Sequence, residues 1–320
     1  MPDLVSVIIV AYNNWPDLEL SIYSALRQTY HPIEVIVVDN GSSDATGQEV
    51  TRRFGHAVRY VRQGNQGDAG GYNAGMRLAR GEFIQFLDGD DLLTPDKIEK
   101  QVKAFISNPD VDIVYGDVRY FQSGTGRPEW EDCDQRDYQD MLAVLVTPDA
   151  NGISAHSMLY RRRALDRVGA WDEEMYVADR DYWLRAAWAG CRFCYCPGTL
   201  YFYRRRSAQM TENKSAMMRG FEAVWSKALC YITSEPYRST VSVMLARLRF
   251  RIAISKYGMT NREAIAKLKL ARASNPEAVP ALPYALGWAL IVMPGGHLLV
   301  RTPWLRAFRR RIVDFLCLQY

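Results

Sequence analysis

Three carboxylates stand within four residues of one another in the sequence Asp88-Gly89-Asp90-Asp91. They follow residues 83–87, a short apolar run with the composition of a buried β-strand. Carboxylates this close repel one another unless a cation or water offsets their charge. Their oxygens are hard ligands, which favour Mg²⁺ or Mn²⁺, particularly beside phosphate oxygens. A solvated turn also fits the composition, but the position at a strand end favours a metal site at Asp88 and Asp90.

Polar residues also follow two earlier strands, which we predict at residues 5–10 and 33–38. The first strand is followed by Ala11-Tyr12-Asn13-Asn14, and the second by Asp39-Asn40. In open α/β sheets, ligands bind beyond the carboxyl ends of the strands. We therefore expect both clusters to meet the carboxylates of residues 88–91 at one edge of the sheet.

Glycine is dense in residues 64–75, where it occupies positions that include Gly67, Gly70, Gly71 and Gly75. These glycines could let the backbone approach a ligand closely, although no Walker pattern is present. The turn after the first strand also lacks G-x-G-x-x-G, which disfavours a dinucleotide cofactor.

The spacing of apolar residues predicts the elements that position these side chains. Short β-rich runs alternate with helical ones, which argues for an α/β fold with a mostly parallel, Rossmann-like sheet flanked by helices. Thr94-Pro95-Asp96 predicts a helix start, with Thr94 as N-cap and proline at the first position. From residue 215 onward the pattern is helical. The predicted strands are residues 5–10, 33–38, 58–61, 83–87, 113–120 and 199–203, and the predicted early helices are 15–28 and 45–54.

The charges divide the 320-residue chain into two parts. Residues 215–320 hold 16 Lys and Arg against 5 Asp and Glu, a net charge of +11, whereas residues 1–214 hold 24 against 31, a net charge of −7. We predict two regions at this boundary, because an acidic part suits metal and polar ligands and a basic part suits an anionic surface. The six cysteines are sparse and no basic leader opens the chain, so we expect a cytosolic setting.

The basic region contains a long uncharged run. No Asp, Glu, Lys or Arg occurs between Glu277 and Arg301. Pro283 and the Pro294-Gly295-Gly296 break predict two short helices at a membrane interface rather than one that spans it. A cluster of arginines after residue 300 would attract anionic headgroups. The alternative is a helical cover packed on the rest of the protein. We expect a peripheral position on the cytosolic face of a membrane, and no nucleic-acid partner.

Seven motifs follow one another over residues 3–213. They are VSVIIVAYNN, VVDNGSSD, NQGDAGGYNAG, ARGEFIQFLDGDDLLTPDKI, VGAWDEEM, ADRDYWLRAAWAG and YFYRRRSAQMT. This set resembles the family-2 inverting glycosyltransferases, which have the A-type nucleotide-sugar fold. Each motif is modestly specific, but the ordered set is highly specific.

The resemblance implies a site for a nucleotide diphosphate-sugar donor. Tyr12 matches the residue beside the nucleobase, and Asp88 and Asp90 match the metal-binding pair. Asp39-Asn40 matches a base-recognising pair that is usually two aspartates, although the Asn40 oxygen can still accept from a pyrimidine N3–H. The donor residues implied in this way are Ala11, Tyr12, Asn13, Asp39, Asn40, Gly67, Asn73, Asp88, Arg204 and Arg206.

The resemblance also implies an acceptor side. Asp179 falls where the family has its general base, with Asp181 in reserve, although both positions also suit the first turn of a helix. Trp171, Asp172 and Glu173 match the segment beside the acceptor, although a large ring there is equally suited to the core.

Two basic or metal-like groups complete the candidates. Arg204, Arg205 and Arg206 suit phosphate oxygens, although a solvated turn is the simpler alternative. Relatives often have a histidine near the third arginine, so its replacement removes an expected histidine metal ligand. His156 is expected to be a packed, hydrogen-bonded residue, and the cysteines at 191, 194 and 196 lack a fourth zinc ligand.

The leading hypothesis is a metal-dependent inverting transfer of a sugar to an acceptor hydroxyl. The resemblance implies a glycan or lipid-linked acceptor, in bacterial cell-surface polysaccharide or glycolipid synthesis. A magnesium-dependent phosphohydrolase that uses Asp88 and Asp90 is one alternative, but no early nucleophile or partnering lysine can be assigned. A degenerate glycan-binding module on membranes is the other.

Overall fold

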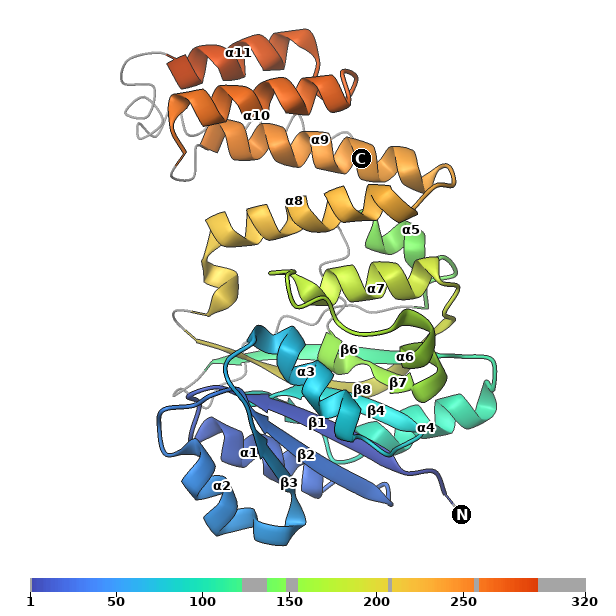
Figure 1. Cartoon of the computed structure of the whole chain (residues 1–320). Helices are drawn as coiled ribbons and strands as arrows, with labels where there is room; N and C mark the ends of the chain where they lie inside the picture. Colours follow the sequence, from blue (N-terminus) through green and yellow to red (C-terminus); the bar gives the residue numbers. More distant parts are fainter. Residues whose placement is uncertain (1, 123–136, 148–154, 207–208, 256–258, 293–320) are drawn as a thin grey trace. The chain divides into compact units, whose positions relative to one another are not determined.

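The structure is a computed structural model that describes residues 2–122, 137–147, 155–206, 209–255 and 259–292 (Figure 1). The chain divides into two compact units, Met1–Glu212 and Asn213–Tyr320. The first unit is built on a sheet, and the described part of the second is helical.

The described residues of the first unit form an eight-stranded sheet in the order β3-β2-β1-β4-β7-β6-β8-β5. Strands β1 to β4 run parallel, β7 runs antiparallel to β4 and β6, β8 runs parallel to β6, and β5 is antiparallel to β8. The predicted α/β fold with a mostly parallel, Rossmann-like sheet is confirmed. The strands are β1 Val5–Ala11, β2 Ile33–Asp39, β3 Arg59–Arg62, β4 Phe83–Asp88, β5 Leu92–Leu93, β6 Ile113–Gln122, β7 Leu159–Arg161 and β8 Phe193–Arg205.

Helices cover both faces of this sheet, as Figure 1 shows for α1, α2 and α4 on one side and α3, α6 and α7 on the other. Every residue of β1 is buried, which explains why its sequence is a continuous apolar run rather than an alternating one. Val7 and Ile9 pack into the cluster that includes Leu18 and Ile98. The helices are α1 Asp17–Leu26, α2 Thr46–Phe54, α3 Gly67–Leu78, α4 Lys97–Ser107, α5 Met141–Leu145, α6 Arg162–Val168 and α7 Ala178–Trp188.

From Gly67 onward the glycine-dense stretch lies within helix α3, where Gly71 and Gly75 serve packing rather than ligand approach. A Cβ at Gly71 would lie 2.6 Å from Val10 Cγ1, and one at Gly75 would overlap Ile8. These glycines let α3 lie directly on β1. Gly67 is different, because it has a positive φ of 68° and open space where a Cβ would lie. The close approach expected of Gly71 and Gly75 is therefore to the sheet.

The start of α4 differs from the prediction. The helix begins at Lys97, its N-cap is Asp96, and the cap makes no side-chain hydrogen bond. The Thr94 carbonyl accepts hydrogen bonds from Lys97 N at 3.2 Å and from Gln28 Nε2 at 2.8 Å. Thr94 is thus part of the turn after β5, and the predicted Thr94 N-cap is wrong.

The described part of the second unit has four helices, with an apolar core between the last three. Ala246 and Phe250 of α9, Leu268 of α10 and Ile291 of α11 are buried together. Pro283 lies in the first turn of α11, where it is tolerated because that N–H has no intrahelical partner. The helices are α8 Lys214–Tyr231, α9 Tyr237–Ser255, α10 Asn261–Ser274 and α11 Ala281–Val292.

The uncharged run of the second unit is thus partly a packed helix. A Cβ at Gly287 would lie 3.2 Å from both Ile254 and Phe250, so α11 packs closely on α9. Within the described residues, no helix is long and apolar enough to cross a membrane. The predicted break at Pro294 and the arginine cluster after residue 300 lie outside the described residues.

Candidate active site

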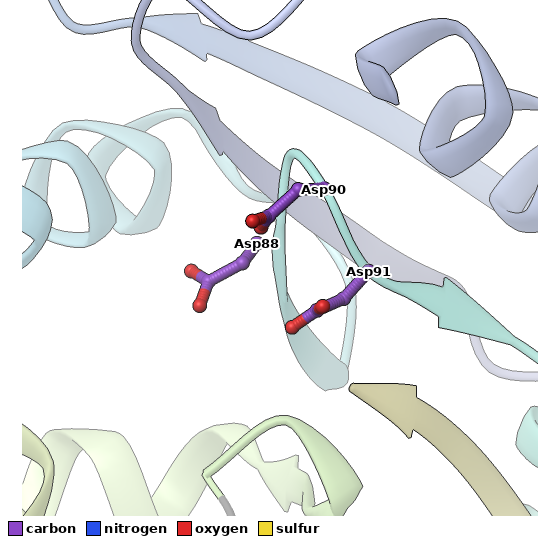
Figure 2. A group of neighbouring side chains, drawn as sticks. All are labelled: Asp88, Asp90 and Asp91. Atoms are coloured by element: carbon purple, nitrogen blue, oxygen red, sulfur yellow. The ribbon is translucent and has the colours of Figure 1, made fainter. Parts of the chain in front are cut away.

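The carboxylate cluster lies at the turn between β4 and β5. One oxygen from each of Asp88, Asp90 and Asp91 lies within 4.8 Å of the others. Figure 2 shows Asp88 and Asp90 extending to the same side of this loop. Gly89 makes the turn possible, because a Cβ there would lie 2.9 Å from the Val10 carbonyl oxygen. The loop therefore lies against the end of β1, where the first polar cluster begins.

Asp88 is held by two donors from other elements. Tyr72 of α3 donates its hydroxyl to Oδ1, and His156 Nε2 lies 2.9 Å from Oδ2. Burial alone would raise the pKa of Asp88, but the charge and hydrogen bond of His156 and the bond from Tyr72 outweigh it, and the pKa is lowered. Burial likewise lowers the pKa of His156, yet Asp88 outweighs it and raises that pKa overall. Asp88 is therefore ionised and fixed in orientation.

Among the residues that the structure describes, Arg206 is the cation that pairs with Asp90. Arg206 Nη2 pairs with Asp90 Oδ2, and Arg206 Nη1 lies 3.5 Å from Asp17 Oδ2. Burial and the charge of Asp88 raise the pKa of Asp90 despite this guanidinium. The buried Nε of Arg206 makes no hydrogen bond within the described residues. Asp90 is thus a carboxylate whose charge the protein compensates only in part.

Asp91 has a structural role. It is 1% exposed, its Oδ2 accepts from the Tyr201 hydroxyl, and its Oδ1 accepts from Arg204 N at 2.7 Å. Burial, followed by the charges of Asp90 and Asp88, raises the pKa of Asp91 well above its ordinary value. Asp88 and Asp90 are therefore the two carboxylates of the cluster available to a ligand.

A cleft with a volume of about 370 Å³ opens over this pair. Tyr12 lies in it with 52% of its surface exposed, as a ring available for stacking. Asp68, in the first turn of α3, adds a carboxylate that was not among the predicted site residues. The lining residues are Val10, Tyr12, Asn14, Asp68, Asp88, Gly89, Asp90, Asp91, Tyr203, Arg206, Gln209, Met210 and Thr211.

Arg204 and Arg206, both predicted to face the donor, lie in different environments. Arg206 lines the cleft. Arg204 is buried, donates from Nε to the Asp90 carbonyl at 2.6 Å, and lies with Nη1 3.3 Å from Asp17 Oδ1. Its guanidinium also lies over the Phe121 ring, 4.5 Å from the centroid. Arg204 thus ties β8 to the carboxylate loop, and Arg206 is the arginine at the cleft.

Asp39 and Asn40 hold the loops at the end of β2. Asp39 accepts from Ser42 N at 2.7 Å and from the Tyr60 hydroxyl at 2.6 Å. Asn40 Oδ1 accepts from Gln63 Nε2 at 3.0 Å and from the amide of residue 66 at 3.2 Å. The Asn40 oxygen that was expected to be open to a pyrimidine therefore already accepts two hydrogen bonds.

Three further predicted donor residues position the backbone of these loops. The Ala11 carbonyl accepts from Asn40 N at 2.8 Å. Asn13 has a positive φ of 49°, and its Oδ1 accepts from Ser43 N at 2.7 Å. The Gly67 carbonyl accepts from Asn40 Nδ2 at 2.8 Å. These contacts bring together the ends of β1 and β2 and the start of α3, as the sequence predicted for the strand ends.

Asn73 joins the donor side to the predicted acceptor segment. Its Nδ2 donates to the Trp171 carbonyl at 2.9 Å and to Glu173 Oε1 at 2.8 Å, and its Oδ1 accepts from Trp171 N at 2.8 Å. Asn73 is buried, so it acts as a clamp on residues 171–173. Glu173 is exposed, and Asp172 accepts from Glu174 N at 3.0 Å within the same turn.

Trp171 is a core residue. Its side chain is 2% exposed, and its ring stacks on Tyr182 with centroids 4.2 Å apart and an interplanar angle of 16°. It also contacts the rings of Tyr72 and Phe86 at 5.1 Å. A buried ring cannot stack on an acceptor sugar, so the expected contact by Trp171 is not supported and the core alternative accounts for it.

The two aspartates of α7 also separate. Asp179 is half-buried in the first turn and accepts from Arg180 N at 2.7 Å. Its charge contributes to the raised pKa values of His156 and Asp68, which places it in the electrostatic surroundings of the cleft. Asp181 is fully buried and pairs with Arg185 one turn later at 2.8 Å. Asp181 therefore stabilises α7 and does not face an acceptor.

Comparison with known proteins identifies the family. The family model described as glycosyl transferase family 2 matches residues 6–169. An uncharacterized glycosyltransferase of Rickettsia typhi is 30% identical over 236 residues, which cover 72% of this chain and 73% of the relative. The chain belongs to glycosyltransferase family 2. Glycosyltransferase GlyG of Streptococcus pneumoniae is 26% identical over 282 residues, which cover 81% of this chain and 89% of that relative.

Solved structures share the fold of this glycosyltransferase. The S. aureus TarS fragment 1–349, in complex with UDP-GlcNAc, has a TM-score of 0.66, 18% identity and 90% coverage of both chains. The mannosyltransferase PcManGT from Pyrobaculum calidifontis, in complex with GDP-Man and Mn²⁺, has a TM-score of 0.58 and 20% identity, and covers 99% of this chain and 86% of its own. The family assignment gives no support to the phosphohydrolase or the glycan-binding module.

The residues at the cleft fit a divalent cation. Asp88 and Asp90 offer carboxylate oxygens on the same side of the loop (Figure 2), and burial, followed by the charge of Asp88, raises the pKa of Asp90. An all-oxygen donor pair beside an open cleft suits Mg²⁺ or Mn²⁺, which keep several water or phosphate ligands. His156 contacts Asp88 rather than standing as an independent ligand. His156 is thus buried and hydrogen-bonded, as the sequence predicted, but no local signal indicated that its partner is Asp88.

Proposed function

We propose that this glycosyltransferase transfers a sugar from a nucleotide diphosphate-sugar to an acceptor hydroxyl, with inversion at the sugar carbon and with a divalent cation. The observation that carries this proposal is the cleft in which Tyr12, Asp88, Asp90 and Arg206 meet at the carboxyl ends of β1 and β4. It combines an aromatic surface, a carboxylate pair and a guanidinium, which are the groups that a nucleobase and a charged diphosphate require.

The exposed Tyr12 ring stacks on the nucleobase, and Arg206 binds the diphosphate. In the structure Arg206 pairs with Asp90, so donor binding must draw the guanidinium from Asp90 toward phosphate oxygens. Asp88 and Asp90 would hold Mg²⁺ or Mn²⁺, which supplies charge stabilisation to the departing nucleotide diphosphate. Because the Asn40 oxygen is already engaged, base selection rests on other groups, and UDP-, dTDP- and GDP-sugars are all candidates.

Asp179 accepts the proton of the acceptor hydroxyl as that oxygen attacks the sugar carbon. Inversion needs one such base on the side opposite the leaving nucleotide. The family correspondence supports this assignment, and Asp179 is close enough for its charge to act on Asp68 in the cleft. Asp172 and Glu173, in the segment that Asn73 holds, are available to hydrogen-bond the acceptor.

Nucleotide release from a panel of nucleotide-sugars, with Mn²⁺, with Mg²⁺ and with excess chelator, tests the activity. We expect release only with metal. With the best donor, Asp179→Asn should bind the donor normally and lose about 10²–10⁴-fold in turnover, because only the proton acceptor is removed. Near-normal turnover of this variant at saturating acceptor would contradict the assignment. The anomeric configuration of the product, measured by NMR, tests inversion.

We also propose that the enzyme acts at an anionic membrane surface, on a glycan or lipid-linked acceptor of bacterial polysaccharide or glycolipid synthesis. The basic charge of residues 215–320 supports this, since each basic residue near such a surface contributes about 1 kcal/mol. Because α11 packs on α9, the matched truncation removes residues 293–320 only. It should weaken binding to anionic vesicles while donor binding persists. Equal vesicle binding by both forms would refute the proposal.

Charge reversal sharpens this test without shortening the chain. Replacing Arg309, Arg310 and Arg311 by glutamate should weaken vesicle binding most at low salt, where screening is least. The control is the same variant with neutral vesicles, for which no change is expected.

A further inference from the structure

One amine is buried in the core of the first unit. Lys97, the first residue of α4, is fully buried. Its Nζ donates to Gln85 Oε1 on β4 at 2.5 Å and to Gln101 Oε1, one turn later on α4, at 2.7 Å. Burial lowers the pKa of Lys97 to about 7. Both the charged and the neutral amine have enough hydrogens for the two bonds, so the arrangement holds on either side of that pKa.

Both glutamines also donate hydrogen bonds to a short 3₁₀ helix at Ala155–Ser157. Gln85 Nε2 donates to the His156 carbonyl at 2.8 Å. Gln101 Nε2 donates to the Ser157 carbonyl at 2.7 Å and to the Val114 carbonyl at 3.1 Å. The carbonyls of His156 and Ser157 therefore accept hydrogen bonds from Gln85 and Gln101. The side-chain oxygens of these two glutamines in turn accept from Lys97 Nζ.

The backbone position of His156 matters because its ring has one polar anchor. Nε2 lies 2.9 Å from Asp88 Oδ2, and the buried Nδ1 makes no hydrogen bond within the described residues. Metal-binding carboxylates and histidines are usually oriented by a hydrogen bond on the side away from the metal. Here the His156 ring orients Asp88, and the position of that ring depends on the peptide backbone of residues 156 and 157.

We infer that Lys97 is a positioning residue for the reaction. Through Gln85 and Gln101 it places His156 against Asp88, and so fixes the first carboxylate of the metal pair. This inference rests on the proposed metal-dependent function. Lys97 itself has no exposed surface and cannot touch a substrate. An apolar residue of similar length would fill the space, but it would leave both glutamine oxygens without a buried donor and free the two side chains to turn.

Lys97→Met tests this, with Lys103→Met as the matched control on the exposed face of the same helix, where Lys103 pairs with Glu99. We measure the Mn²⁺ concentration for half-maximal turnover and kcat at saturating Mn²⁺. Lys97→Met should raise the Mn²⁺ concentration by about 10-fold or more, the usual effect of losing an orienting partner, while kcat at saturating Mn²⁺ changes less. Lys103→Met should match the wild type. An unchanged Mn²⁺ requirement in a folded Lys97→Met protein overturns the inference.

A double-mutant cycle separates positioning from a general loss of stability. If Lys97 acts through His156, adding Lys97→Met to His156→Ala should leave the Mn²⁺ requirement at the value of His156→Ala alone. If the increases in Mn²⁺ requirement caused by the two single substitutions multiply in the double variant, Lys97 acts independently of His156, and the inference is overturned.

Gln85→Glu keeps the test available if Lys97→Met fails to fold. The carboxylate still accepts from Lys97 Nζ, but it no longer donates to the His156 carbonyl, so a folded protein with a raised Mn²⁺ requirement is expected. An unchanged requirement counts against the inference. If the wild type itself needs no metal, the proposed function fails, and a crystal structure of the same variant decides the inference separately. A His156 Nε2 to Asp88 distance that stays at 2.9 Å would then overturn it.

Discussion

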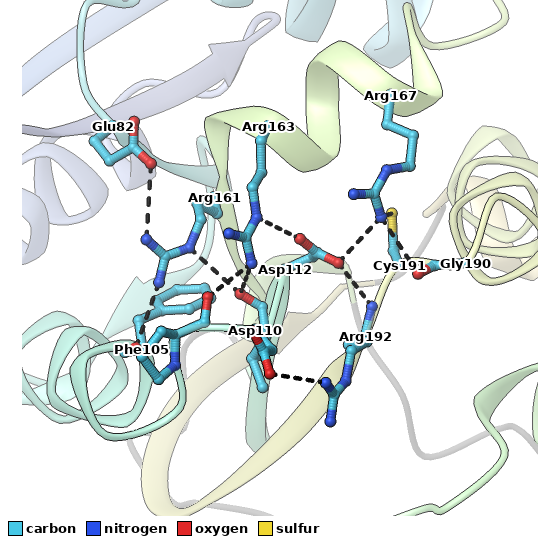
Figure 3. Close-up of polar contacts among 12 residues, drawn as sticks. Glu82, Phe105, Asp110, Asp112, Arg161, Arg163, Arg167, Gly190, Cys191 and Arg192 are labelled. Atoms are coloured by element: carbon cyan, nitrogen blue, oxygen red, sulfur yellow. Dashed lines mark hydrogen bonds and ion pairs between the residues drawn. The ribbon is translucent and has the colours of Figure 1, made fainter.

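Two sites built on carboxylates lie at opposite ends of the strands of the same sheet, with opposite charge balance. Residues 88–91 follow the carboxyl end of β4, whereas Asp112 precedes the amino end of β6, which runs in the same direction. The Asp112 carboxylate is buried and lies 2.6 Å from Arg163 Nε, 3.2 Å from Arg167 Nη1 and 3.0 Å from the Arg192 amide (Figure 3). Asp112 thereby joins the starts of β6, α6 and β8.

The pKa values express this difference. Burial alone would raise the pKa of Asp112, but the bond from the Arg192 amide and the pairing with Arg163 outweigh it, and the pKa is lowered. At the cleft, repulsion adds to burial, and the pKa values of Asp90 and Asp91 are raised. A carboxylate that the protein has already saturated with cations stabilises the fold. One that is left undercompensated has free energy to gain from a bound cation.

The largest expected effect comes from removing the undercompensated carboxylate. Asp90→Ala should lower metal-dependent turnover by about 1000-fold, because several kcal/mol of charge stabilisation at the departing diphosphate are lost. Donor binding should weaken as well. The free energy of unfolding without ligands should change by less than about 1 kcal/mol, since the loss of Arg206's partner is offset by relief of repulsion with Asp88. Steady-state kinetics and urea unfolding measure both effects. A large loss of stability would show that Asp90, like Asp112, is a carboxylate that stabilises the fold.

Asp112→Ala should show the reverse pattern. The free energy of unfolding should fall by about 2–3 kcal/mol, because hydrogen bonds to a buried charged group are lost and the Arg192 amide is left without its acceptor. The kinetic constants at a temperature where the variant is folded should stay within about twofold of the wild type, because Asp112 lies at the edge away from the cleft. If turnover falls by more than the fraction of unfolded protein can explain, Asp112 also affects the cleft, and the distinction between the two sites does not hold.

The strands and the carboxylate pair could be predicted from the sequence for a physical reason. A parallel strand buried on both faces is a continuous apolar run, so residues 5–10 and 83–87 stand out without an alignment. Ligand groups gather beyond the carboxyl ends of such strands, which is why Tyr12 and Asp88 were expected to meet.

What the sequence did not show is which polar groups are engaged by neighbours distant in the chain. Asn40 and Asp181 have residue types suited to binding, but Asn40 is engaged by Gln63 from a distant loop, and Asp181 is fully buried in the folded unit. His156 has no local signal, because its partner Asp88 lies 68 positions earlier in the numbering and the two meet only through the sheet. Trp171 is likewise assigned to the core by rings from three other elements.

The smallest expected effect concerns how the free energy of unfolding changes with pH, because Asp68 and Asp112 should contribute to this dependence with opposite signs. Burial, followed by the charge of Asp88, raises the pKa of Asp68 from 3.8 to about 6, whereas the pKa of Asp112 is lowered from 3.8. Between pH 6 and 4 the native protein therefore binds more protons at Asp68 than the unfolded chain does, so this group adds stability as the pH falls. Asp112 does the opposite, since its contribution is present above its unfolded pKa and is lost as the pH falls through the lower folded value.

Urea unfolding of Asp68→Asn, Asp112→Asn and the wild type, in steps from about pH 3 to pH 8, measures these signs. Asp68→Asn should be more stable than the wild type above pH 6, because a repelled carboxylate is gone, and the difference should shrink toward pH 4. Asp112→Asn should be less stable than the wild type at neutral pH and should approach it only in acid. Asp68 lines the cleft, where neighbouring groups displace part of its hydration, but its side chain keeps an exposed surface. Solvent therefore screens its interactions, and its effect should be the smaller of the two. If both differences had the same sign across this range, the contrast between a ligand-binding and a structural carboxylate would not hold for these two residues.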